Sequence, residues 1–140
     1  MLKRLSRDEL LENIAQLVAE RSTCGRLSVG ALLASEGRII SMGYNGAPAG
    51  MPHCDESVCY PGSEEPCTRT VHAEANAIAF AARKGIETEG ATLYTTHSPC
   101  NECAKLIINA GIKRMIYWEE YRDPAPLVML EEAGVDWDQF

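Results

Sequence analysis

One imidazole, two thiols and one carboxylate of this chain have the spacing of a metal-dependent catalytic site. His72-Ala73-Glu74 is followed by the segment Pro99-Cys100-Asn101-Glu102-Cys103. A tetrahedral zinc ion held by one nitrogen and two sulfurs keeps its fourth position for water, which is typical of catalytic rather than structural zinc sites. We therefore predict His72, Cys100 and Cys103 as zinc ligands and Glu74 as the group that moves protons.

Each part of this pattern has a simpler interpretation when it stands alone. A lone C-x-x-C is commonly a redox pair or half of a zinc knuckle, and a lone His at a helix start is often a cap. Joined at this spacing, with strand and helix patterns on both sides, the parts favour catalysis. H-x-E followed by P-C-x-x-C is the signature of zinc deaminases of nucleobases, in which zinc activates water. Glu74 is then expected to take the water proton, deliver it to the ring nitrogen and assist the departure of ammonia.

Hydrophobic periodicity predicts the elements that position these residues. Ser6 and Glu9 have capping-box spacing at the start of a helix that we expect to end near residues 21–22. Further helices are expected over 72–84, from 99 or 100 to 110, and over 127–133; strands are expected over 29–34, 38–44, 91–96, 113–118 and near 137. Because strands alternate with helices in the second half, we predict an α/β fold with parallel strand pairing there.

Length and composition limit the class of protein. The chain has 140 residues, which predicts one domain over 1–140. The N-terminus is charged where a signal peptide has an apolar run, and no stretch approaches the ~18 apolar residues of a membrane span. These features predict a cytoplasmic protein without a membrane partner. Thirteen Lys and Arg against twenty Asp and Glu give a net charge of −7, which disfavours a nucleic-acid polymer as partner.

With these motifs described, the sequence resembles the cytidine and deoxycytidylate deaminase superfamily, and within it the deoxycytidylate (dCMP) deaminases of phages and bacteria. The resemblance extends over nearly the whole chain and includes residues 28–31, 43–50, 52–55, 69–78 and 96–100. It implies a three-layer α/β/α cytidine-deaminase-like fold with a central mixed sheet of about five strands. It also implies zinc-dependent hydrolytic deamination of dCMP to dUMP and ammonia, which supplies dUMP for dTMP synthesis.

The resemblance implies substrate-binding roles for seven residues: Arg26, Asn45, Ala73, His97, Ser98, Tyr121 and Arg122. Asn45 is expected to bond the deoxyribose, Arg26 the phosphate with help from Arg122, and Tyr121 to lie near the pyrimidine. Ala73, His97 and Ser98 are expected to line the pocket mainly through backbone groups. The alternatives are that Asn45 is a turn residue, Arg26 a solvated loop charge and Tyr121 a packing residue.

Members of this family are often homohexamers that dCTP activates and dTTP inhibits. The resemblance implies that the regulatory nucleotide binds beside Gly43, Tyr44, Asn45 and Gly46, near a subunit contact. Glycines permit close approach of the backbone to phosphate. The alternative is that this glycine-rich segment is only a turn.

Four further cysteines are not needed for the catalytic site: Cys24, Cys54, Cys59 and Cys67. Spare thiols in a cytoplasmic protein, three of them in one long loop, predict a second, closed, structural zinc site. Cys24 and Cys54 match positions at which related enzymes bind a structural metal, and His53 is a possible substitute ligand. The alternative is that these thiols are free and buried.

Two other functions remain open at this point. One is deamination of a different base or nucleoside, such as cytidine, guanine or tRNA adenosine; the acidic charge disfavours tRNA, and Tyr44-Asn45-Gly46 favours a nucleotide. The other is a non-catalytic, zinc-stabilised module that binds nucleotides. The presence of Glu74 disfavours this module, because binding alone does not need that carboxylate.

Overall fold

The computed structural model describes residues 2–54 and 67–140. Its elements follow the predicted pattern closely: α1 (Arg7–Ala19), β1 (Gly30–Ser35), β2 (Arg38–Tyr44), α2 (Ala73–Lys84), β3 (Thr92–His97), α3 (Asn101–Asn109), β4 (Arg114–Glu119), α4 (Ala125–Glu132) and β5 (Asp136–Gln139). The capping box of Ser6 and Glu9 is formed, although α1 ends at Ala19, earlier than expected. Within the described ranges, we find no helix with the length and apolar character needed to cross a membrane.

The strands form one mixed sheet with the order β2-β1-β3-β4-β5. β1 pairs antiparallel with both β2 and β3, and its hairpin to β2 turns at Glu36 and Gly37, which both have positive φ. β3, β4 and β5 are parallel, as the alternation of strands and helices predicted. The mixed five-stranded sheet is therefore confirmed.

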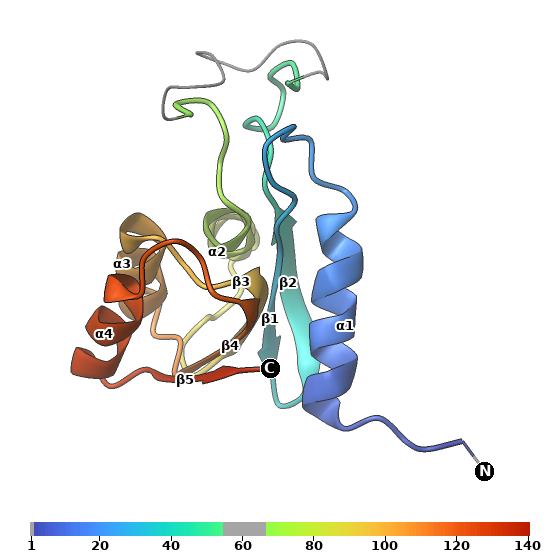
Figure 1. Cartoon of the computed structure of the whole chain (residues 1–140), viewed down its shortest axis with the longest axis vertical. Helices are drawn as coiled ribbons and strands as arrows, with labels where there is room; N and C mark the ends of the chain where they lie inside the picture. The colour runs from blue at the N-terminus through green and yellow to red at the C-terminus, as the bar shows by residue number, and fades with distance from the viewer. Residues whose placement is uncertain (1, 55–66) are drawn as a thin grey trace.

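Helices cover both faces of this sheet and make three layers (Figure 1). Leu32, Ala34, Tyr94 and Ile116 pack with α1 on one face. Their neighbours along the strands point to the opposite face, because side chains alternate along a strand, and pack against α2, α3 and α4. The α/β/α fold class is thus confirmed, and α2 and α3, which carry the predicted zinc ligands, lie on the same face.

Gly43 allows α2 to approach the sheet closely. A Cβ atom at this position would lie 2.5 Å from the carbonyl oxygen of Ala73 and 2.6 Å from the nitrogen of Ala77. Both atoms belong to the backbone of α2, so a side chain at residue 43 requires the helix to shift. The absence of a side chain at Gly43 therefore lets the first turns of α2 lie close to β2.

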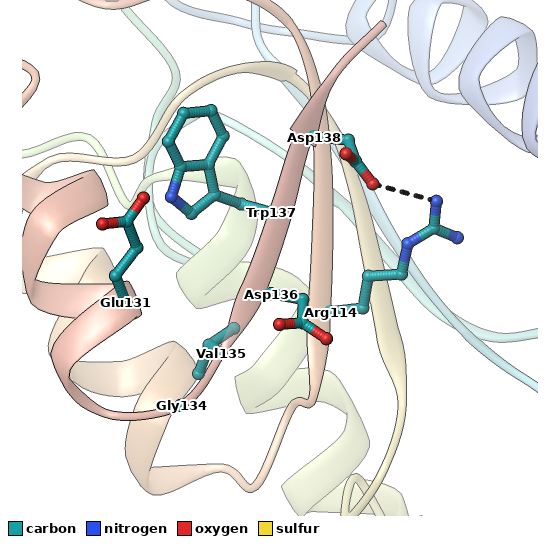
Figure 2. A pocket seen from close by; sticks show the side chains of 7 residues that line it. All are labelled: Arg114, Glu131, Gly134, Val135, Asp136, Trp137 and Asp138. Carbon is teal, nitrogen blue, oxygen red and sulfur yellow. Dashed lines mark hydrogen bonds and ion pairs between the residues drawn. The ribbon is translucent and has the colours of Figure 1, made fainter.

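A polar network joins the start of α1 to β3, β4 and the edge strand β5. The Tyr94 hydroxyl donates to Asp8 at 2.7 Å, and Arg114 pairs with Asp8 at 3.1 Å and Asp138 at 3.2 Å. Figure 2 shows Arg114 and Asp138 on β4 and β5, at a hollow of about 430 Å³ that also includes Trp137. The residues lining this hollow include neither His nor Cys, so it is separate from the predicted zinc chemistry.

Candidate active site

The three predicted zinc ligands meet where two helices begin. His72 is the N-cap residue of α2, Cys100 is the N-cap residue of α3, and Cys103 lies in the first turn of α3. His72 Nδ1 lies 3.4 Å from the Sγ atoms of both Cys100 and Cys103. His72 and Cys100 lie in the extended backbone that directly precedes each helix.

This geometry fits a zinc ion. Zn–N and Zn–S bonds of about 2.1 and 2.3 Å at a tetrahedral angle separate nitrogen from sulfur by about 3.6 Å. The three ligand atoms lie within 4.8 Å of one another, and no other such group of His, Cys, Asp or Glu occurs among residues 2–54 and 67–140. The donor set of one imidazole and two thiols is also one that zinc prefers.

The two thiols share one proton, which leaves the negative charge on Cys100. Hydrogen bonds lower the pKa of Cys100 to about 3, and the bond from Cys103 contributes more than the bond from His72. The pKa of Cys103 is raised, because it shares its proton with Cys100 and is buried. The bond to Cys100 also raises the pKa of His72. A bound dication would stabilise both sulfurs as thiolates, since a metal is the largest local charge in such a site.

Glu74 lies beside this group in the first turn of α2. Its side chain is buried, with 4% of the residue exposed. Burial raises its pKa to about 7, the range in which a carboxyl group can both accept and donate a proton at neutral pH. The structure therefore places a carboxyl group that can exchange a proton near neutral pH next to the potential metal site.

A cavity of about 1000 Å³ opens over these groups. It is lined by all seven residues for which we predicted substrate contacts: Arg26, Asn45, Ala73, His97, Ser98, Tyr121 and Arg122. Sequence reasoning missed Val29, Thr70, Glu119 and Glu120, which also line it. Glu119 and Glu120 could have been anticipated, since ligands of α/β sheets bind at the carboxyl ends of parallel strands, and Glu119 ends β4 while Glu120 follows it.

Comparison with known proteins decides the family. The family model of the cytidine and deoxycytidylate deaminase zinc-binding region matches residues 5–119. The chain belongs to this deaminase family. It is 43% identical over 139 residues to ComE operon protein 2 of Bacillus subtilis, covering 99% of this chain and 73% of that protein. It is 37% identical to the deoxycytidylate deaminase of Enterobacteria phage T2, covering 88% and 86% of the two chains.

A solved structure supports the same assignment. The dCMP deaminase of cyanophage S-TIM5, in complex with dCMP and dUMP, matches with a TM-score of 0.87 and 33% identity. The match covers 99% of this chain and 100% of the cyanophage chain. The resemblance seen in the motifs is thereby confirmed over the whole fold, and this chain is a deaminase of that family.

In this deaminase, Asn45 supports the cavity wall. Its Oδ1 accepts the backbone N–H of Val29 at 2.8 Å, and its Nδ2 donates to the carbonyl of Leu27 at 2.6 Å. Asn45 is therefore more than a turn residue, because its amide holds the segment that includes Arg26. An amide offers two donors and two acceptors, so these bonds leave capacity for a ligand.

The glycines of the predicted regulatory segment have neighbours within the deaminase domain. Gly43 faces α2, and a Cβ atom on Gly46 would collide with the Thr23 hydroxyl. Gly46 also forms an isolated bridge with Val71, the residue before His72. Tight packing between segments of the same chain is thus a physical reason for both glycines.

The structure describes three of the four spare cysteines: Cys24, Cys54 and Cys67. All three are half-buried, and Cys24 and Cys67 line the active-site cavity. Although burial opposes it, hydrogen bonds with the side chain and the backbone of Thr70 lower the pKa of Cys67. Cys59 lies outside the described residues, and His53 is exposed.

Proposed function

We propose that residues 1–140 act as one domain that deaminates dCMP hydrolytically to dUMP and ammonia. The observation that carries this proposal is the buried Glu74 beside a His/Cys/Cys group of zinc geometry, inside a cavity with two arginines in its wall. The names of the phage relatives and the nucleotides bound to the cyanophage enzyme support dCMP as the substrate.

Glu74 performs the proton transfers in this proposal. His72, Cys100 and Cys103 hold zinc, which supplies the Lewis acidity that makes water nucleophilic at neutral pH. Glu74 accepts the proton of the attacking water and passes it to the pyrimidine ring nitrogen. It then assists the exocyclic amine to leave as ammonia. A carboxyl pKa of about 7 suits both directions of transfer.

The remaining cavity residues bind the nucleotide. Tyr121 packs against the pyrimidine, and Asn45 bonds the deoxyribose. Arg26 and Arg122 bind the phosphate, because a guanidinium group can hold two phosphate oxygens at once. Ala73, His97 and Ser98 complete the wall around the base. The cavity of about 1000 Å³ has room for a mononucleotide.

Ammonia release from dCMP, cytidine and dCTP tests this function. We expect turnover with dCMP, at least tenfold lower kcat/KM with the other two, and loss of activity in a chelator with recovery on adding zinc. Faster turnover of cytidine would indicate a nucleoside deaminase instead. Nucleotide binding without any ammonia release would indicate a non-catalytic module.

We further propose that the chain binds a second, structural zinc through Cys24, Cys54, Cys59 and Cys67, with His53 as a possible replacement for one thiol. Its support is the presence of spare thiols, two of which lie at the same cavity. Metal analysis should return two zinc ions per wild-type chain and one per Cys54→Ser chain. One zinc ion in the wild-type protein would exclude this second site.

Family resemblance also supports regulation in a cytoplasmic homohexamer. We propose that dCTP activates and dTTP inhibits the enzyme by binding beside residues 43–46. dCMP saturation curves should become steeper in dTTP and hyperbolic in dCTP, and sedimentation should give six subunits. Curves unaffected by either nucleotide would exclude this regulation.

A further inference from the structure

We propose that Ser98 is a positioning residue: its hydroxyl holds the Glu119–Arg122 segment over the cavity and so determines where Arg122 meets the substrate phosphate. The inference rests on the proposed dCMP deamination. It differs from the sequence-based expectation that Ser98 contributes mainly backbone groups to the cavity wall.

Ser98 bonds this segment in both directions. Its Oγ accepts the backbone N–H of Tyr121 at 2.6 Å, and its own N–H donates to the carbonyl of Glu119 at 2.9 Å. Ser98 is buried, with 3% of the residue exposed, so water cannot readily replace either bond. The two bonds fix the chain on both sides of Glu120 as it leaves β4.

His97 adds a side-chain contact to the same segment. Its Nε2 lies 3.4 Å from Oε2 of Glu119, and its Nδ1 lies 2.9 Å from the Thr96 hydroxyl. Thr96 Oγ1 already accepts the N–H of Gly30 at 3.2 Å. The hydroxyl proton of Thr96 can therefore point at Nδ1, which leaves the ring hydrogen on Nε2, facing Glu119.

The position of Tyr121 also determines the position of its neighbour Arg122. The Arg122 guanidinium lies over the Tyr121 ring, with Cζ 5.6 Å from the ring centroid. Asp123 Oδ1 accepts the N–H of Ala125 at 2.9 Å, so the far end of the loop is tied to the start of α4. With both ends held, Tyr121 and Arg122 present their side chains to the cavity from a defined backbone.

Ser98→Ala is the direct test. Without the hydroxyl, the Tyr121 N–H has no partner and the loop loses its defined position. We expect KM for dCMP to rise about tenfold while kcat changes less than threefold. Deoxycytidine has no phosphate for Arg122 and depends on this segment only through Tyr121 beside the pyrimidine, so its kcat/KM should fall at least threefold less than that of dCMP. Ser98→Thr, which keeps the hydroxyl, should restore most of the affinity for dCMP.

Ser41→Ala is the matched control, because Ser41 is an equally buried serine whose hydroxyl bonds the Ala77 carbonyl far from this loop. It should lower thermal stability without changing the preference for dCMP over deoxycytidine. An equal loss of kcat/KM for dCMP and deoxycytidine in Ser98→Ala, or no loss for either, would overturn the proposal.

Arg122→Ala provides a second test that does not depend on the folding of Ser98→Ala, since Arg122 is exposed. It should raise KM for dCMP but not for deoxycytidine, and adding Ser98→Ala should cause little further change. An Arg122→Ala enzyme with unchanged KM for dCMP would also contradict the proposal. If the proposed function itself is wrong, the wild-type protein will release no ammonia from dCMP, which separates that failure from a failure of the Ser98 proposal. In that case the Ser98–Tyr121 bond can still be tested, because hydrogen exchange at the Tyr121 amide should be faster in Ser98→Ala.

Discussion

At the scale of single residues, the fold sets the charge state of each reacting group by burial and by its nearest neighbours. Cys100 is held as a thiolate by hydrogen bonds from Cys103 and His72. Glu74 is buried among these groups, so desolvation opposes its ionisation and brings its pKa into the neutral range. The starts of α2 and α3 therefore bring together a carboxyl group able to give up and recover a proton and a thiolate of the kind that zinc prefers.

Glu74→Gln tests whether the Glu74 carboxyl group carries the proton while other residues hold the metal. The amide keeps the size of the side chain but cannot carry a proton, so ammonia release from dCMP should fall about a thousandfold. Zinc content should stay at the wild-type value, because the three ligands are intact. Glu102→Gln is the matched control: Glu102 lies between the two cysteine ligands but is exposed and paired with Lys105, and its loss should leave the rate unchanged. A Glu74→Gln enzyme with near wild-type turnover would remove Glu74 from the mechanism.

At the scale of elements, the site depends on how α2 and α3 approach the sheet. Each helix starts with a residue in extended backbone, and those residues are His72 and Cys100. Helix starts favour negative charge, which suits the thiolate of Cys100. The position of α2 depends on Gly43, whose missing side chain leaves room for the helix backbone at Ala73 and Ala77.

Gly43→Ala should therefore affect both stability and activity. The added methyl group would lie 2.5 Å from a backbone oxygen of α2, and the helix must move to relieve this contact. We expect a loss of about 1–3 kcal/mol in the free energy of unfolding, measured in urea, and reduced ammonia release. Gly25→Ala is the control for stability, because its Cβ would meet no atom within 4 Å. Equal stability of the two variants would show that α2 is not held by this contact.

At the scale of the whole molecule, the layer formed by α1 contains an unusual buried acid. Glu12 is fully buried, and neither of its carboxyl oxygens has a hydrogen-bond partner in the part of the chain that the structure describes. Burial raises its pKa from 4.5 to about 8. The folded protein therefore keeps a proton on Glu12 at pH values at which the unfolded chain releases it.

This difference predicts a pH-dependent cost to stability. Between about pH 4.5 and 8 the folded state binds the extra proton, so the free energy of unfolding contributed by Glu12 falls as the pH rises. Glu12→Gln removes this dependence and should be about 2 kcal/mol more stable than wild type at pH 8, with little difference at pH 4.5. Denaturant titrations across this range provide the measurement. The exposed Glu131→Gln should follow the wild-type curve, and a Glu12→Gln protein that does so too would show that Glu12 is ionised in the fold.

The sequence by itself determined the elements and the reacting groups. Helices and strands follow from the local periodicity of apolar residues. The predicted zinc ligands follow from donor chemistry and from the i, i+3 spacing of Cys100 and Cys103, and both are properties of short segments. The family was also recognisable at this level, because its motifs are continuous stretches of chain.

Only the tertiary structure decided the contacts between distant segments. It places β1 between β2 and β3 and closes Ser98 onto the loop that carries Tyr121. It also buries Glu12, whose carboxyl oxygens have no hydrogen-bond partner among the described residues. None of these leaves a periodic signal, since each depends on which surfaces pack together across long separations in the chain. Local patterns therefore reveal which residues can react, whereas packing between layers determines how the residues around them are held.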